Sequence, residues 1–173
     1  PDLYKLPLGP GGDPLGTWEK IPMTGFVMDD AGVGFNANGL VGDFDGNVLA
    51  VVNINTGVLY RVDTATGVAD QIEIEGAEQL FGNGDGLHMS GRTLYIMQNF
   101  QNKIAVVQLS HDLTKGQFVK NLVSGDFAIP TTITGFGDSI YAINTHFCEI
   151  TPLCGLDPAD PTEFQTEVVK VHK

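Results

Sequence analysis

The chain has 173 residues, of which 42% are hydrophobic, and it carries a formal net charge of −12. That length suits one domain with a sizeable core, and the composition argues against disorder. Nucleic acid and anionic membrane surfaces are excluded as partners, because phosphate binding needs a basic face. No apolar run approaches the roughly 20 residues that a membrane-spanning helix requires.

The first 26 residues predict two short strands joined by a loop rich in glycine and proline. Residues 3–6 and 18–21 are the two candidate strands, and Pro22 ends the second. We expect this pair, residues 1–26, to be the outer half of a four-stranded sheet, a half-blade whose inner half the sequence does not contain.

Residues 38–76 predict one complete sheet of four antiparallel strands. Turn residues of the Asn, Asp and Gly types separate four apolar stretches, which we expect to be the strands: 38–43, 48–53, 58–63 and 69–74. Such turn chemistry between short strands is typical of an all-β fold with tight connections.

The same arrangement recurs twice further along the chain. Residues 84–127 predict a second complete sheet, and residues 130–173 predict an incomplete third one, in which an insertion precedes the last strand. We expect no helix longer than two turns.

A short motif opens each unit and defines the period of the repeat. Asn38 and Asp85 are each followed by Gly-Leu, and they lie 47 residues apart; Thr131 follows 46 residues after Asp85. Strand-rich repeats of roughly 40–50 residues are typical of β-propellers. The sequence therefore predicts an all-β fold, a β-propeller, with about three and a half four-stranded blades.

Three and a half blades do not close into a ring, whereas closed propellers typically have about 4–8 blades. Both ends of the chain would present strands with unpaired edges, which natural proteins avoid. We therefore expect further polypeptide to complete the functional unit, either the missing N-terminal half or another copy of the chain.

The two cysteines lie in the insertion of the last unit. Cys148 and Cys154 stand six positions apart in a loop that contains Pro152 and Gly155. A short disulfide exposed in this loop is the favoured interpretation, and with the acidic composition it predicts a secreted protein. The alternative is a pair of unpaired thiols; a zinc site has no His or Cys at ligand spacing to support it.

Four stretches form a combination more specific than any one of them: Gly34 to Gly39, Asn55 to Asp63, Asn83 to Leu87, and Ile129 to Thr132. In this combination the chain resembles the C-terminal half of the senescence-marker-protein/gluconolactonase/luciferin-regenerating-enzyme family of six-bladed propellers. The resemblance covers essentially all 173 residues. The insertion with the two cysteines is the least typical part.

The resemblance implies a divalent cation, usually calcium, held on the central axis by a Glu, two Asn and an Asp from innermost strands. Asn38 matches the second Asn, and Asp85 matches the Asp and is the expected catalytic residue. The Glu and the first Asn would lie upstream of Pro1. The implied activity is hydrolysis of a lactone or ester, with the metal polarising the carbonyl or a bound water. Thr131 would line the same pocket mouth.

The residues themselves allow this placement, because the first residues of innermost strands converge on the axis and amide and carboxylate oxygens suit calcium. For Asn38 and Asp85 the alternative is a turn residue, since Asn or Asp before Gly is a common turn signal. His88 is expected to be a packed or edge residue. For the whole protein, the alternative is a secreted propeller that binds a ligand or protein and catalyses nothing.

Overall fold

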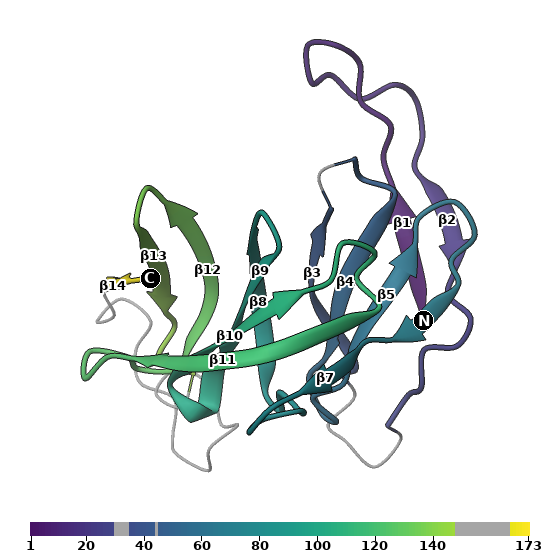
Figure 1. Cartoon of the computed structure of the whole chain (residues 1–173). Helices are drawn as coiled ribbons and strands as arrows, with labels where there is room; N and C mark the ends of the chain where they lie inside the picture. Colours follow the sequence, from purple (N-terminus) through teal and green to yellow (C-terminus); the bar gives the residue numbers. More distant parts are fainter. Residues whose placement is uncertain (30–34, 44, 148–166) are drawn as a thin grey trace.

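The computed structural model describes residues 1–29, 35–43, 45–147 and 167–173. These residues form fourteen strands and one 3-10 helix of three residues, arranged in four sheets (Figure 1). The predicted all-β fold without a long helix is therefore confirmed over the described residues. Nor does this part of the chain contain a helix long and apolar enough to cross a membrane.

The sheets follow the order of the sequence. The first pairs β1 (Asp2–Lys5) with β2 (Glu19–Pro22). The second contains, from its innermost strand outward, β3 (Ala37–Gly42), β4 (Val48–Asn53), β5 (Leu59–Asp63) and β6 (Ala69–Gln71). The third contains β8 (Gly84–Ser90), β9 (Thr93–Gln98), β10 (Lys103–Leu109), β11 (Lys115–Val123) and β7 (Glu73–Glu75), with the 3-10 helix η1 (Asn99–Gln101) between β9 and β10. The fourth contains β12 (Pro130–Phe136), β13 (Ser139–Asn144) and β14 (Glu167–His172).

One predicted strand is wrong. The sequence predicts a continuous outer strand over residues 69–74, but the chain leaves the second sheet at Ile72, and β7 pairs in parallel with β11 of the third sheet. Ile72 is buried between these two sheets, and Ile74 packs against the same core. The alternation that suggests one strand thus reflects burial at the junction of two sheets.

The core lies between successive sheets. In β9, Leu94 and Ile96 pack toward the second sheet, whereas Tyr95 and Met97 pack toward the fourth. Both faces of this strand are buried, which explains why its sequence is continuously apolar. Between the first and second sheets, a further cluster includes Phe26, Tyr60 and Val62.

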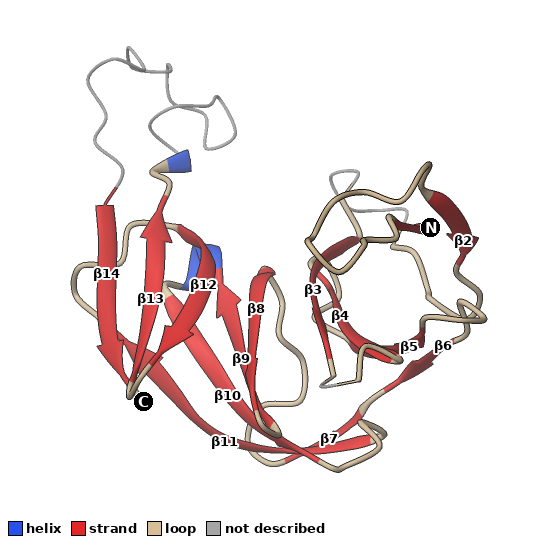
Figure 2. Ribbon diagram, turned by 90° about the horizontal axis from the view of Figure 1, so that it is seen from above, coloured by secondary structure: helices blue, strands red, loops and turns tan. Residues whose placement is uncertain are grey.

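The innermost strands of three sheets lie side by side, β3 beside β8 and β8 beside β12 (Figure 2). Two glycines permit this approach. A Cβ added to Gly39 would collide with the carbonyl oxygen of Asp85, and a Cβ added to Gly86 would lie 2.6 Å from the Cα of Thr132. The glycine of the repeated motif is therefore required by packing, because backbone meets backbone with no room for a side chain.

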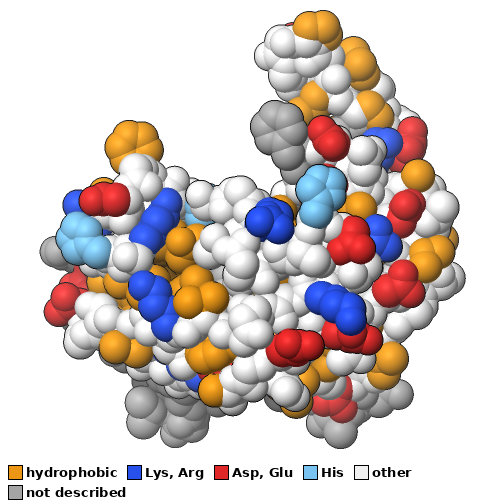
Figure 3. Space-filling view, in the orientation of Figure 1, with side chains coloured by type: hydrophobic (Ala, Val, Ile, Leu, Met, Phe, Trp, Pro, Cys, Tyr) orange, Lys and Arg blue, Asp and Glu red, His pale blue; other side chains and the backbone are white. Residues whose placement is uncertain are grey.

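The connection between β1 and β2 projects beyond the sheets as an arm of residues 6–18 (Figures 1 and 3). Its only charged side chain is Asp13. Its exposed apolar residues are Leu6, Leu8, Leu15 and Trp18. Such an apolar surface on an acidic protein is typical of an interaction site.

Replacing Gly86 by alanine tests the contact between innermost strands. Because the added methyl group would meet backbone atoms of β12 that have no freedom to move aside, we expect Gly86→Ala to lower the free energy of unfolding by about 2–3 kcal/mol in urea denaturation. Gly125→Ala is the matched control, since nothing lies within 4 Å of a Cβ there. Equal stability of the two variants would contradict the proposed contact.

Candidate functional site

Each innermost strand begins with a β-bulge, and the candidate residues lie in these bulges. In β3 the pair Asn38 and Gly39 lies opposite a single residue of β4, and in β8 the pair Asp85 and Gly86 lies opposite a single residue of β9. In β12, Thr131 is the extra residue in the pairing with β13. A bulge re-aims the side chain it carries and is common beside functional sites.

The glycine contacts place the three candidates on neighbouring strands at the same level. Gly39, directly after Asn38, abuts the backbone of Asp85; Gly86, directly after Asp85, abuts the backbone of Thr131. Asn38 is exposed, whereas Asp85 and Thr131 are partly buried. The spacing of the sequence motif thus corresponds to spatial neighbours, and the metal-binding and pocket-lining roles of these residues stay predictions.

Asp85 has the most unusual environment of the three. Burial raises the pKa of its carboxyl group, and a hydrogen bond from Asn99 opposes that effect without cancelling it. The bond joins Nδ2 of Asn99 to Oδ2 of Asp85 at 3.0 Å. Among the described residues Asn99 is the only hydrogen-bond donor to this carboxylate. A carboxylate that is partly withdrawn from water and has no cationic partner in the described part of the chain is suited to hold a cation.

Sequence reasoning missed Asn99, which is 3% exposed and directly follows β9. The recurring pattern in the sequence lies one residue earlier and does not identify Asn99: a side-chain amide ends the second strand of every unit, at Asn53, Gln98 and Asn144. Each of these three amides donates to a carbonyl of the segment before an innermost strand. The acceptors are Val27, Gly82 and Asp126, at 3.1, 3.0 and 2.7 Å. Buried amides at this position therefore fix the backbone segment that leads into each bulge.

His88 is packed between sheets, as the sequence predicts. Its ring lies against Gly135 of β12, and its centroid is 6.0 Å from that of Tyr95. Burial lowers the pKa of His88, and the charge of Lys173 adds to this effect. His88 is therefore a packing residue whose environment favours the neutral imidazole.

The donors present fit a hard cation in type but supply only part of a coordination sphere. Calcium takes about 6–8 oxygen ligands, and Asn38 and Asp85 offer an amide and a carboxylate. Over the part of the chain that the structure describes, no group of three or more His, Cys, Asp or Glu side chains is placed to hold a metal. Cys148 and Cys154 lie outside the described residues, so their pairing stays a prediction.

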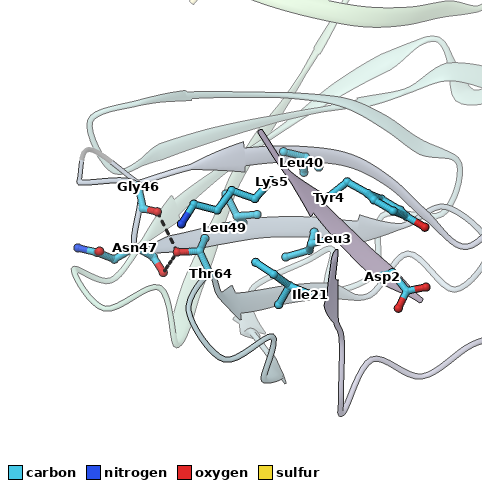
Figure 4. A pocket seen from close by; sticks show the side chains of 10 residues that line it. All are labelled: Asp2, Leu3, Tyr4, Lys5, Ile21, Leu40, Gly46, Asn47, Leu49 and Thr64. Atoms are coloured by element: carbon cyan, nitrogen blue, oxygen red, sulfur yellow. Dashed lines mark hydrogen bonds between the residues drawn. The ribbon is translucent and has the colours of Figure 1, made fainter. Parts of the chain in front are cut away.

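A pocket of about 590 Å³ lies elsewhere, between the β1–β2 hairpin and the second sheet (Figure 4). Its apolar wall consists of Leu3, Tyr4, Ile21, Leu40 and Leu49. On its polar side the Thr64 hydroxyl donates to the carbonyls of Gly46 and Asn47, both at 3.1 Å. None of the candidate site residues lines this hollow, which is a gap between two sheets.

The sequence matches no protein-family model and no curated protein. The fold is similar to a 6-phosphogluconolactonase-like protein from Bacteroides uniformis, with a TM-score of 0.55 and 14% identity, over 99% of this chain and 51% of that one. It is also similar to luciferin-regenerating enzyme, with a TM-score of 0.51 and 16% identity, again over 99% and 51%.

At these identities the likeness establishes the fold, and the fold is that of a β-propeller. The chain spans about half the length of both structures. Luciferin-regenerating enzyme is of the propeller type that the sequence motifs resemble. This likeness lies in the backbone and shows the propeller fold alone.

Replacing Asp85 by asparagine tests the electrostatic character of the site. Because the pKa of Asp85 is raised in the folded state, its ionised form destabilises the fold, and stability is regained as pH falls through the raised value toward 3.8. We therefore expect Asp85→Asn to raise the melting temperature in metal-free buffer at neutral pH, with a gain over the wild type that shrinks on acidification.

Asp13→Asn is the control for that measurement. Asp13 is exposed on the arm, and Asp13→Asn changes the net charge by the same amount as Asp85→Asn. Its effect on the melting temperature therefore measures only the relief of general charge repulsion in an acidic chain. An equal gain in both variants, or a gain that does not depend on pH, would contradict the proposed desolvation of Asp85.

Proposed function

We propose that this chain is part of a six-bladed, divalent-cation-dependent hydrolase of the lactonase type, in which Asn38 and Asp85 are two of the cation ligands. One observation carries the proposal. A partly buried carboxylate that has no cationic partner among the described residues lies in the bulge of an innermost strand, and the neighbouring strand presents an exposed amide at the same level. Calcium is the proposed cation, because the family that the motifs resemble usually holds calcium and both donors are oxygens, which suit it.

The cation would supply Lewis acidity, polarising the substrate carbonyl or a water molecule. The residues of this chain would bind the cation and orient the groups around it. Asp85 keeps one oxygen in the hydrogen bond to Asn99, and it is the proposed catalytic carboxylate because it alone among the three bulge residues is ionisable. Thr131 contributes a neutral side chain to the pocket lining. The substrate class is a small lactone or ester.

Further polypeptide is proposed to complete the ring and the ligand set. The first sheet has two strands, whereas the second has four. Leu40 of β3 is 53% exposed and faces the pocket beside β1. Two inner strands seated in that pocket would bury this apolar wall and pair the free edge of β1. They would come from an N-terminal half of the same gene product or from another copy of the chain.

Secretion is proposed together with the disulfide between Cys148 and Cys154. A mass increase on alkylation that appears only after reduction would support both. Modification of both thiols without reduction would remove the argument for an oxidising compartment.

A second function follows from the arm of residues 6–18. Its exposed apolar side chains would suit a propeller that binds a ligand or a protein and catalyses nothing.

Calcium binding and lactone hydrolysis separate these proposals. With only two protein ligands, residues 1–173 should bind Ca²⁺ in calorimetry more weakly than about 10⁻⁴ M and hydrolyse glucono-lactone no faster than buffer. A longer protein containing this segment should hydrolyse the lactone in a Ca²⁺-dependent manner, with a loss of about 100-fold or more in Asp85→Asn.

Two outcomes decide against the proposal. If residues 1–173 form a stable monomer that binds calcium tightly and turns over lactone, both the incomplete ring and the ligand assignment are wrong. If the longer protein binds calcium and hydrolyses neither lactones nor esters, the non-catalytic propeller is the better description.

A further inference from the structure

The segment of residues 99–102, which contains η1, contacts the residues at the beginning of two innermost strands, β8 and β12. We infer that Asn99 is a positioning residue that holds the carboxylate of Asp85 in one orientation, and that Asn102 ties this arrangement to the start of β12. The inference deepens the proposed function, because it concerns the same site, and it assigns a role to residues outside the ligand set.

The orientation of the Asn99 amide follows from its hydrogen bonds. Its Oδ1 accepts from the backbone N–H of Phe100 at 2.7 Å, so its Nδ2 is the end directed at Oδ2 of Asp85. The backbone N–H of Asn99 donates to the carbonyl of Asn83 at 3.0 Å, two residues before Asp85. Since Asn99 is buried, its amide lacks water as an alternative partner.

Asn102 supports the backbone that leads into the next innermost strand. It is in the left-handed region with φ of 49°, and its Oδ1 accepts from the backbone N–H of Ile129 at 2.9 Å. The carbonyl of Ile129 accepts from the N–H and the hydroxyl of Thr145, at 3.3 and 2.7 Å. Ile129 is thus held from both sides, two residues before Thr131.

Ile129 requires this support because its backbone is strained. Its φ is 52°, a region that β-branched residues avoid, and it precedes Pro130, which restricts it further. Strain of about 1–3 kcal/mol persists only where the surroundings impose it, and it is common at functional sites. Asn83, the equivalent residue of the preceding unit, has φ of 59°. A positive φ two residues before the bulge residue is therefore common to both strands.

The chemistry of Asn99 suits a cation site. Lys or Arg at this place would also fix the carboxylate, but its positive charge would repel a cation bound to the other oxygen. A neutral amide orients Oδ2 and leaves the charge of Asp85 intact, so Oδ1 is available for a ligand. Hydrogen-bonded partners of metal ligands typically change metal affinity by about 10–100-fold when removed.

The test compares Asn99→Ser with Asn121→Ala. Serine retains an oxygen that accepts from Phe100 but is too short to donate to Asp85, so the local turn is preserved. Asn121 also donates an amide hydrogen to a carboxylate, that of Glu78 at 3.1 Å, but it lies on the outer strand β11. Asn99→Ala serves as a second variant at the same position.

Two quantities are measured. The first is the pKa of the Asp85 carboxyl group, followed by NMR titration in metal-free buffer. The second is the Ca²⁺ affinity of a longer protein that contains this segment and completes the ligand set. Because the Asn99 hydrogen bond lowers the pKa of Asp85, we expect both Asn99 variants to raise it and to weaken Ca²⁺ binding about 10-fold. Asn121→Ala should change neither quantity.

The two readouts separate this inference from the proposed function. An Asp85 titration that is the same in Asn99→Ser, Asn99→Ala and Asn121→Ala would overturn the positioning role. A shifted titration in a protein that binds no Ca²⁺ would support the positioning of Asp85 and refute the proposed cation site.

Discussion

Direct backbone contact between innermost strands is the constraint on which the rest of the structure depends. Gly39 and Gly86 bring β3, β8 and β12 so close that no Cβ fits between them. Once those strands touch, the bulges that open them lie at one level, and their polar residues become neighbours. The same glycines that permit packing thus determine which side chains share a site.

The sequence predicts most of this arrangement because strands with two buried faces are recognisable. The apolar runs at Thr93–Gln98 and Lys103–Leu109 match β9 and β10, since turn residues bound both runs. The departure of β7 into the next sheet is not predictable in the same way. The alternation of apolar and polar residues shows which side chains are buried. It does not show whether they are buried within one sheet or at the junction of two sheets.

For the site, the spacing of the motif predicts that Asn38, Asp85 and Thr131 are neighbours, because equivalent repeat positions converge. It does not single out Asn99, which comes from a polar run that has the composition of an ordinary turn. Only the three-dimensional path of residues 99–102 shows that this turn reaches across to two innermost strands. Local composition therefore predicts that these residues form a turn, whereas the contacts of the turn depend on the neighbouring sheets.

The crossing of β7 changes how the second and third sheets are joined. β7 continues from the second sheet but forms main-chain hydrogen bonds with β11, and Lys115 of that strand also forms an ion pair with Glu73 at 3.1 Å. Separating the two sheets therefore means shearing a row of backbone bonds in addition to exposing a side-chain interface. We therefore expect the second and third sheets to unfold together as one cooperative unit, whereas sheets joined only by side-chain contacts can separate individually.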